Sequence, residues 1–486
     1  MFGASQDENE HDTVVLDVDE SFFARRNIGL AVNVSSYPGD KTAGEDVDSG
    51  QESVGSPFPF RINVSLVSRH WRDVAVATPS LWETITIPSY PHTQPPSAHI
   101  SLLLKRSLSH PINIHIGGGY RHDAYGLLTP HVHRWRSVTT DFYSHNDAAA
   151  FFRAVNHPSV STPTRLKTLE LYRTESDMDT ERSPDSSPSD QHPGFRSSVP
   201  CLERLVLSGV HVDWDRAWIS SASNLTFLAL VFHSDNFCPS WVQFITILRG
   251  APALKTLKLD AIDSPVEFDW IEDYFASGEM DNPKPPVQLL HLSDLSIGFA
   301  HESTFTVLLD KLDVPLLTSL HIESRDRELD NTSIIRCLTE LPLALPSGAT
   351  PRSLLGRLEH FKIACFPCGR EEVETLYEAL QNLKSFSIVL DHWVYPSSTF
   401  LNVLLSPCTL PGQDAWLPQL EKLYVSSISG YELTRRVVQE RKNVGVPLKA
   451  LYLEEPCGID RESFMWFKES VETLAFFEDN EVSSKP

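Results

Sequence analysis

A six-residue pattern, with apolar residues at its first, fourth and sixth positions, returns eleven times in this 486-residue chain after residue 160. The copies begin at Leu166, Leu202, Leu225, Leu254, Leu292, Leu317, Leu358, Leu383, Leu420, Leu448 and Val471. Eight copies have leucine at both the first and the fourth position, whereas chance would produce about two, since leucine is common in any protein. The excess indicates a structural repeat, which constrains the fold more than any other feature of the sequence.

The spacing of the pattern predicts what each copy builds. Side chains at the fourth and sixth positions lie on one face of a strand, and the first position reaches the same interior from the preceding turn. Six of the ten intervals between successive copies are 23 to 29 residues long, and a unit of that size cannot bury its own apolar face. Such units must stack on their neighbours, with a parallel sheet on the inside and helices or loops on the outside.

This arrangement resembles an irregular leucine-rich-repeat domain. We therefore predict an α/β solenoid over residues 89–477, with parallel strands on the concave side and helices and loops outside. The segments His110–Ile116 and Arg136–Phe142 are expected to be early, poorly marked strands, and Thr332–Leu345 a helix in one of the longer intervals. The repeat is irregular because most copies lack the Asn or Cys that follows in the regular family pattern.

The residues between the buried positions should point to the concave face, where partners usually dock in this architecture. The candidate substrate-binding residues are Tyr172, Arg204, Phe227, Lys258, Asp260, His321, Glu323, Lys362, Tyr424 and Tyr452. Further residues of the same face are Glu170, Val206, Ala229, His360, Lys422 and Glu454. Tyrosine, phenylalanine and mixed charges are typical of a protein-binding surface, and an ordinary solvated sheet face is the alternative interpretation.

The segment 57–88 has the pattern of a helical hairpin. Its apolar residues recur at helical spacing, at Val64, Val67, Trp71, Val74 and Ala75. Thr78-Pro79 is typical of the cap and first turn of a second short helix. The stretches LVSRHWRDVA and TPSLW then resemble the second half of an F-box, of the type common in fungal proteins. The candidate residues for adaptor binding or for the F-box core are Leu66, Val67, Trp71, Arg72, Leu81 and Trp82.

Taken together, the two segments resemble the F-box/leucine-rich-repeat proteins. The resemblance implies a non-catalytic substrate-recognition subunit of an SCF-type ubiquitin ligase, whose F-box binds a Skp-type adaptor and through it the cullin and RING subunits. The repeats would bind an unknown target protein. Trp71 and Trp82 fit either the interior of the helical hairpin or a direct contact with the adaptor. The alternative is a leucine-rich-repeat scaffold that engages no ligase, because residues 1–56 lack the Leu-Pro-x-Glu helix that usually opens the F-box.

Charge and hydropathy argue against other kinds of partner. A net charge of −23, from 41 Lys and Arg against 64 Asp and Glu, disfavours nucleic acid. No apolar run approaches the roughly 18 residues of a membrane span. We expect a disordered acidic tail at 1–56, a flexible acidic insert at 174–200 and a disordered tail at 478–486. Ser183-Pro184 and Ser187-Pro188 in the insert are candidate phosphorylation sites.

No motif supports an enzyme, a metal site or a cofactor. Cys365-x-x-Cys368 is the only C-x-x-C, and it lacks two further ligands at a suitable spacing for zinc. His131-x-His133 has no carboxylate cluster nearby, and neither G-x-S-x-G nor H-E-x-x-H occurs. The first twenty residues contain seven acids and no Lys or Arg, unlike an export leader, so we expect a cytoplasmic or nuclear protein with reduced cysteines.

Overall fold

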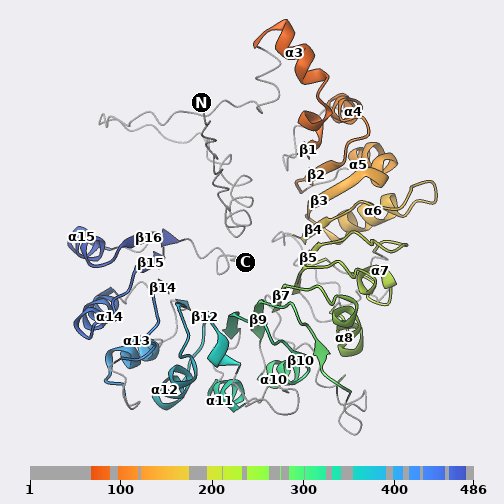
Figure 1. The fold of residues 1–486 in the computed structure, drawn as a ribbon. Coiled ribbons are helices and arrows are strands. Elements are labelled where there is room, and N and C mark those ends of the chain that lie inside the picture. Colours follow the sequence, from red (N-terminus) through yellow and green to blue (C-terminus); the bar gives the residue numbers. More distant parts are fainter. Residues whose placement is uncertain are drawn as a thin grey trace, which may run out of the picture. The chain divides into compact units, whose positions relative to one another are not determined.

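The computed structural model, shown in Figure 1, describes most of the chain beyond residue 66. The described residues are 67–87, 97–118, 122–173, 194–210, 212–232, 238–261, 274, 284–299, 302–324, 331–340, 354–389, 398–408, 415–426, 431–454 and 459–477. The chain divides into two compact units, Met1–Val64 and Ser65–Pro486, and every described residue belongs to the second. The expected tails, Leu66 and residues 174–193 of the expected insert lie outside the described residues.

Fourteen strands form one parallel sheet, in which neighbouring strands follow the order of the chain. They are β1 (Thr84–Ile87), β2 (Ile112–Ile116), β3 (Trp135–Phe142), β4 (Thr168–Arg173), β5 (Arg204–Ser208), β6 (Phe227–Phe232), β7 (Thr256–Ala261), β9 (Asp294–Phe299), β11 (Ser319–Ser324), β12 (His360–Ala364), β13 (Ser385–Val389), β14 (Lys422–Ser426), β15 (Ala450–Glu454) and β16 (Thr473–Phe477). Two short strands, β8 (Val287–Gln288) and β10 (Leu312–Asp313), pair with each other in a separate parallel sheet.

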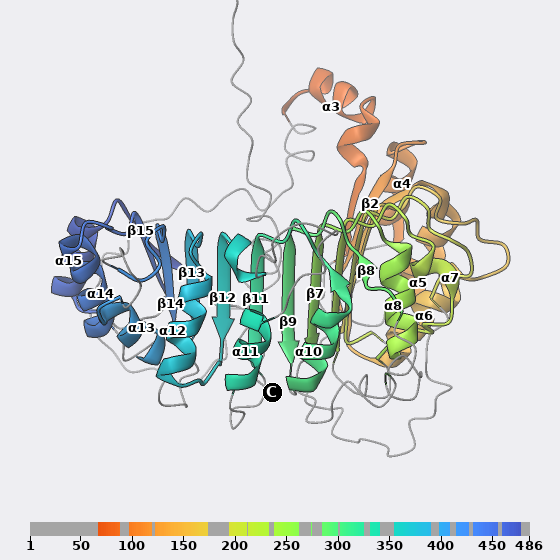
Figure 2. The same cartoon turned by 60° about the horizontal axis from the view of Figure 1, so that its bottom comes forward.

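The helices of this unit lie on the outer side of the curved sheet, so that the strands line its inner side (Figure 1). The α-helices are α3 (Arg69–Val76), α4 (Ser97–Arg106), α5 (His122–Leu128), α6 (His145–Val155), α7 (Ala217–Ser220), α8 (Trp241–Gly250), α10 (Glu302–Asp310), α11 (Thr332–Glu340), α12 (Arg370–Ala379), α13 (Ser398–Leu405), α14 (Tyr431–Asn443) and α15 (Arg461–Ser470). The 3-10 helices are η1 (Pro79–Trp82), η2 (Thr129–Arg134) and η6 (Leu355–Arg357). Helix α3 is the exception to the layering, because it projects beyond the first strands of the sheet (Figure 2).

Every copy of the six-residue pattern forms a strand of the large sheet, from β4 to β16. The leucine at the first position is at most 3% exposed in the first ten copies, which places it in the interior as its spacing predicts. Phe476, at the sixth position of the last copy, is 39% exposed because β16 ends the sheet. The predicted α/β fold with stacked parallel strands is therefore confirmed, and β2 and β3 occupy the two expected early strands.

A chain of backbone hydrogen bonds joins the copies at the position after the first leucine. Each amide at this second position donates to the carbonyl at the same position of the preceding copy, as Glu203 does to Lys167 (2.8 Å) and Lys449 does to Glu421 (2.8 Å). The series runs from the Lys167 amide, which donates to Arg136, to the Glu472 amide. Because the bonds depend only on the strand starts, the length of the intervening segment can vary without changing the stacking.

The start of the sheet is earlier than expected. Strand β1 (Thr84–Ile87) pairs with β2 and lies inside the segment 57–88 that was assigned to the F-box, so residue 89 is wrong as the start of the solenoid. Ile85 and Ile87 alternate with polar residues and are at most 1% exposed, which is the strand period on a half-buried surface. The boundary was missed because this strand carries no leucine pattern.

The end of the expected flexible insert 174–200 is packed into the core. Phe195 and Val199 are at most 1% exposed, and the Phe195 ring contacts Trp218 edge-on at a centroid distance of 5.4 Å. The expectation of a flexible segment is therefore wrong for residues 194–200. Gly194 makes this packing possible, because its φ is +59° and a Cβ built on it would lie 2.1 Å from Nε1 of the buried Trp218.

Replacing Gly194 by alanine should destabilise the protein by about 2 to 4 kcal/mol, from the left-handed backbone and the clash with Trp218 together. Gly445→Ala is the matched control, since its φ is +82° but nothing lies within 4 Å of the added Cβ. We expect the control to lose only about 1 kcal/mol. Urea denaturation measures both values, and equal losses in the two variants would contradict the packing described for Gly194.

Candidate functional site

The register of the sheet aligns the predicted concave-face residues in rows that run across the strands. The middle row consists of Glu170, Val206, Ala229, Lys258, Ser296, His321, Lys362, Ser387, Tyr424, Tyr452 and Ala475. The row before it contains Arg204, Phe227, His360 and Lys422, and the row after it contains Tyr172, Asp260, Glu323 and Glu454. All these side chains alternate with the buried leucine positions, so they belong to the inner face of the sheet (Figure 1).

One cluster of this face combines a carboxylate, a guanidinium and an aromatic ring from β4, β5 and β6. Nε of Arg204 donates to Oε1 of Glu170 at 2.8 Å, and its Cζ lies 3.5 Å from the centre of the Phe227 ring. The second carboxylate oxygen of Glu170 accepts from Oγ1 of Thr139 at 3.1 Å. Glu170 is only 6% exposed, so the ion pair is partly shielded from water and holds the guanidinium in one orientation. We call these residues the arginine cluster.

A second cluster lies at the other end of the sheet. The rings of Tyr424 and Tyr452 stack with a centroid distance of 4.1 Å and an interplanar angle of 4°, and Phe477 meets Tyr424 edge-on at 5.9 Å. Burial, followed by the neighbouring Tyr452, raises the pKa of Tyr424 to about 12. These three rings, the tyrosine cluster, form a rigid apolar surface with hydroxyl groups, which is the composition of many protein-binding hot spots.

The structure therefore brings together two pairs of the predicted residues, Arg204 with Phe227 and Tyr424 with Tyr452. Among the others, His321 and Lys362 lie opposite each other on β11 and β12. His321 makes a hydrogen bond of 2.9 Å between its Nδ1 and Oγ of Ser296, and Glu323 is 6% exposed. The remaining predicted residues are half-buried on their own strands: Tyr172, Lys258, Asp260 and Lys362.

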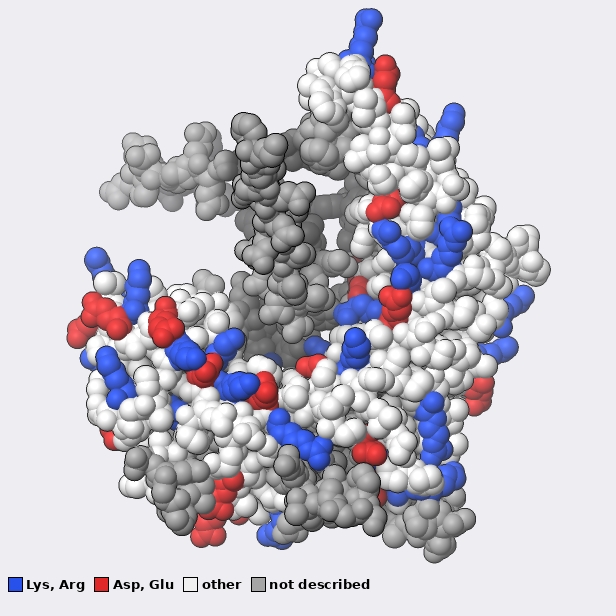
Figure 3. Space-filling view, in the orientation of Figure 1, with Lys and Arg blue, Asp and Glu red and all other residues white. Residues whose placement is uncertain are grey.

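The edge of the inner face carries a charge ladder that the sequence reading missed. It is formed by the second-position side chains, which pair across neighbouring copies: Lys167 with Glu203 (2.7 Å), Lys384 with Glu359 (2.9 Å) and Lys449 with Glu421 (2.6 Å). Basic and acidic side chains alternate along this edge in Figure 3. The hydrogen bond from Lys449 lowers the pKa of Glu421, and the same bond raises the pKa of Lys449. Lys or Glu is the second letter of eight of the eleven copies, and the two alternate over the last five; this was the signal that could have predicted the ladder.

Helix α3 begins later than the helical spacing of its apolar residues predicts. Ser68 has an extended backbone and its hydroxyl accepts a hydrogen bond from the Trp71 amide at 3.2 Å, so it caps a helix that starts at Arg69. The second element of the expected hairpin is not an α-helix but the four-residue 3-10 helix η1, which starts at Pro79. The segment therefore forms one α-helix followed by a short 3-10 helix, and not a hairpin of two α-helices.

The two tryptophans of this segment have different environments. Trp82 is 2% exposed, its Nε1 donates to the Ala75 carbonyl at 2.7 Å, and Arg106 lies 4.3 Å from its ring centre. Trp71 is 50% exposed. Trp82 is therefore part of the protein interior, whereas Trp71 is not.

The other apolar residues near Trp71 are also open to solvent. Val67 is 69% exposed, and Val74 and Val76 are each 41% exposed. Arg72 is exposed and Leu81 is half-buried, while Leu66 lies outside the described residues. The large apolar side chains on α3 and just before it are therefore exposed, whereas those on η1 are buried or half-buried.

Within the described ranges, no group of three or more His, Cys, Asp or Glu side chains is placed to hold a metal ion. None of the described helices is both long enough and apolar enough to span a membrane. No protein-family model and no curated protein sequence matches the chain significantly. The case for a function therefore rests on the geometry of the inner face and of α3.

The raised pKa of Tyr424 gives a test of the tyrosine cluster. When the pKa of a phenol is higher in the folded than in the unfolded protein, its contribution to the folding stability is lost as the pH rises, here between about pH 10 and 12. In an absorbance titration of tyrosine ionisation, Tyr424→Phe should remove a component with a midpoint near pH 12 and make the unfolding free energy less sensitive to pH above 10. A variant whose titration above pH 11 superimposes on that of the wild type would contradict the buried stack.

Proposed function

We propose that this chain is a non-catalytic substrate-recognition subunit of an SCF-type ubiquitin ligase. In this proposal α3 and η1 belong to an F-box-like segment that binds a Skp-type adaptor, and the inner face of an irregular leucine-rich-repeat solenoid binds the target protein. The single observation that carries the proposal is the set of exposed apolar side chains on α3. The protein would act in the cytoplasm or nucleus.

The exposed residues have the spacing of a docking helix. Trp71 and Val74 are three residues apart on α3, so they lie along one side of the helix axis, and Val67 lies just before the cap residue Ser68. Single exposed apolar residues are common on protein surfaces, but a contiguous group with a large aromatic residue marks an interaction site. An apolar helix face of this kind buries against the helices of a partner, and tryptophan is the residue type that most often dominates such contacts.

The burial of α3 is confined to its last turn. Ala75 is fully buried and its carbonyl accepts the Trp82 indole hydrogen bond, which ties the last turn of the helix to η1. Strand β1 follows directly after η1, so the helix is attached to the first strand of the sheet. The start of the sheet therefore anchors the last turn of α3, while the helix projects beyond the first strands (Figure 2). Trp71, one turn before Ala75 on the same side of the helix, stays exposed and is available to a partner.

The inner face supplies the second half of the proposal. The arginine cluster and the tyrosine cluster lie on different strands, with five strands between β6 and β14 in the sheet order and polar residues on those strands. Both clusters are held rigid by stacking or ion pairing, so little side-chain entropy is lost when a target binds. This is the composition of a surface that recognises an extended protein segment rather than a small molecule.

A leucine-rich-repeat scaffold that engages no ligase is the second candidate. It is favoured by the absence, in residues 1–56, of the Leu-Pro-x-Glu sequence with which the F-box usually begins. Both candidates use the inner face in the same way. Binding to the adaptor therefore separates them.

We expect the full-length chain to bind a recombinant Skp-type adaptor and Trp71→Ala to reduce that affinity at least tenfold, because a tryptophan hot spot contributes about 2 kcal/mol or more. The variant should remain folded, with a stability loss well below the roughly 3 to 5 kcal/mol of a fully buried ring. Val242→Ala on α8 is the control, since Val242 is also 50% exposed. Calorimetry measures both, and a wild-type chain that does not bind the adaptor would refute the ligase and leave the scaffold.

A further inference from the structure

A pocket of about 340 Å³ lies on the outer side of the sheet, between the end of α6 and the segment that leads into α7. Its lining consists of Phe152, Arg153, Asn156, His157, Pro158, Arg196 and Arg216. None of the residues that line it is a carboxylate. The charged residues that line this pocket are therefore all basic, although the chain as a whole has a net charge of −23.

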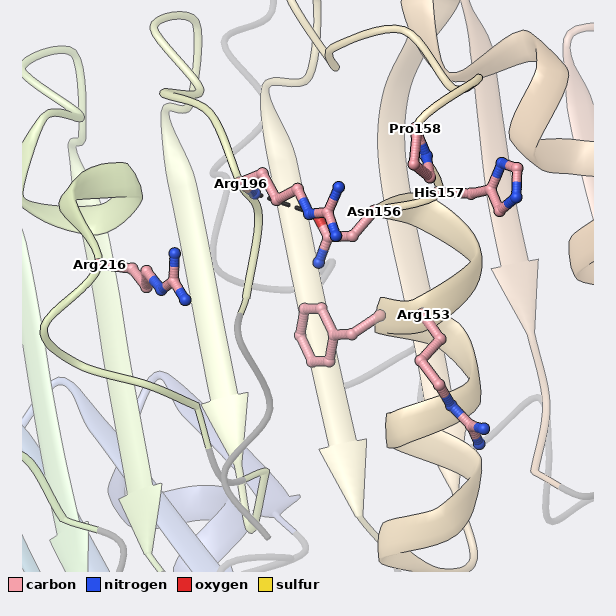
Figure 4. A pocket seen from close by; sticks show the side chains of 7 residues that line it. Arg153, Asn156, His157, Pro158, Arg196 and Arg216 are labelled. Carbon is pink, nitrogen blue, oxygen red and sulfur yellow. Dashed lines mark hydrogen bonds between the residues drawn. The ribbon is translucent and has the colours of Figure 1, made fainter. Parts of the chain in front are cut away.

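Arg196 and Arg216 line the pocket from two different parts of the chain. In Figure 4 Arg196 extends across Asn156 toward α6 and Arg216 extends toward the pocket from the segment before α7, while Arg153 extends along α6 and His157 points away. Nε of Arg216 pairs with Oδ2 of Asp213 at 2.9 Å, which uses one of its five N–H donors and fixes the plane of its guanidinium. Arg196 and Arg216 thus contribute guanidinium groups from two parts of the chain to the lining of one pocket.

The position of Arg196 is set by its backbone. The side chain of Asn156, the C-cap residue of α6, accepts the Arg196 amide at 3.0 Å and donates to the Gly194 carbonyl at 2.5 Å. Asn156 is 9% exposed, so both bonds are shielded from water. The segment that carries Arg196 is therefore clamped to the helix end, and the pocket is built rather than formed by chance contact of mobile side chains.

The end of α6 does not cancel this positive charge. A helix C-terminus has a partial charge of about −0.5, which alone would repel an anion. Three guanidinium groups contribute a formal charge of +3 at any physiological pH, and the Asp213 carboxylate offsets one of them. The net potential in the pocket stays positive, by more than one charge.

We propose that this pocket binds a phosphate monoester carried on a peptide, that is, a phosphorylated serine or threonine side chain. Several guanidinium groups around one pocket match the three acceptor oxygens and the near −2 charge of such a group. The exposed ring of Pro158 adds an apolar surface on which the peptide next to the phosphate can pack. This inference does not depend on binding to a Skp-type adaptor.

The chain itself contains a sequence of this chemistry. Residues 174–193 carry six acidic side chains and one basic side chain, and they include Ser183-Pro184 and Ser187-Pro188. The same segment leads directly to Gly194 and Arg196. A peptide with the sequence of residues 181–192, phosphorylated on Ser187, is therefore the natural probe.

The test titrates the full-length, phosphatase-treated chain with this phosphopeptide, with the same peptide lacking phosphate, and with inorganic phosphate. We expect the phosphopeptide to bind at least about tenfold more tightly than the other two, and increasing salt to weaken it. The double variant Arg196→Gln with Arg216→Gln should lose most of this preference. Arg249→Gln on α8, an exposed arginine outside the pocket, is the matched control and should bind like the wild type.

Any one of three other outcomes would overturn the proposal. Equal binding of the two peptides would define a site for acidic peptides without a role for phosphate. Inorganic phosphate that binds as tightly as the phosphopeptide would define a site for the free ion. A double variant that binds the phosphopeptide like the wild type, while circular dichroism shows that it is folded, would place the binding elsewhere.

Discussion

The rest of the structure depends on the burial of leucine in units that are too small to bury it alone. Each copy contributes three apolar side chains, and the first of them, such as Leu254 or Leu383, is fully buried only because a neighbouring copy covers it. At about 25 cal/mol per Å² of apolar surface, this burial is the main stabilising term of such a stack. Stacking in turn determines that the strands are parallel and that the positions between the leucines form one continuous face.

Two buried arginines donate hydrogen bonds to the turns that precede strands of the sheet. Arg441 donates to the carbonyls of Trp416 (2.8 Å) and Leu417 (3.0 Å), and Arg134 donates in the same way to the Leu108 and Leu104 carbonyls. Both arginines are 2% exposed. Leu108 and Leu417 have positive φ, so each arginine stabilises a turn whose backbone is strained and whose carbonyls would otherwise be buried without a donor.

The parts of the fold that follow from a local pattern could be predicted from the sequence, and those that depend on distant residues could not. The eleven strands from β4 to β16 were predictable because each copy carries its own three apolar positions. Strand β1 lacks that pattern, and the burial of Phe195 depends on its contact with Trp218. The same limit applies to the sites. Spacing alone placed the concave residues on one face, but it could not predict which of them touch.

The separation of Trp71 from Trp82 shows why contact matters more than residue type for function. Both are tryptophans in one short segment. The hydrogen bond to the Ala75 carbonyl holds Trp82 in the interior, whereas Trp71 is exposed. In the outer pocket, likewise, a hydrogen bond to the side chain of Asn156 holds the backbone of Arg196 in place. The α3 surface, the inner face and the outer pocket are thus each held by their own local bonds and share no residue. Substitutions in one should leave the others unchanged, as expected for sites without shared partners, so a single chain can carry separate surfaces for an adaptor, a target and a phosphorylated peptide.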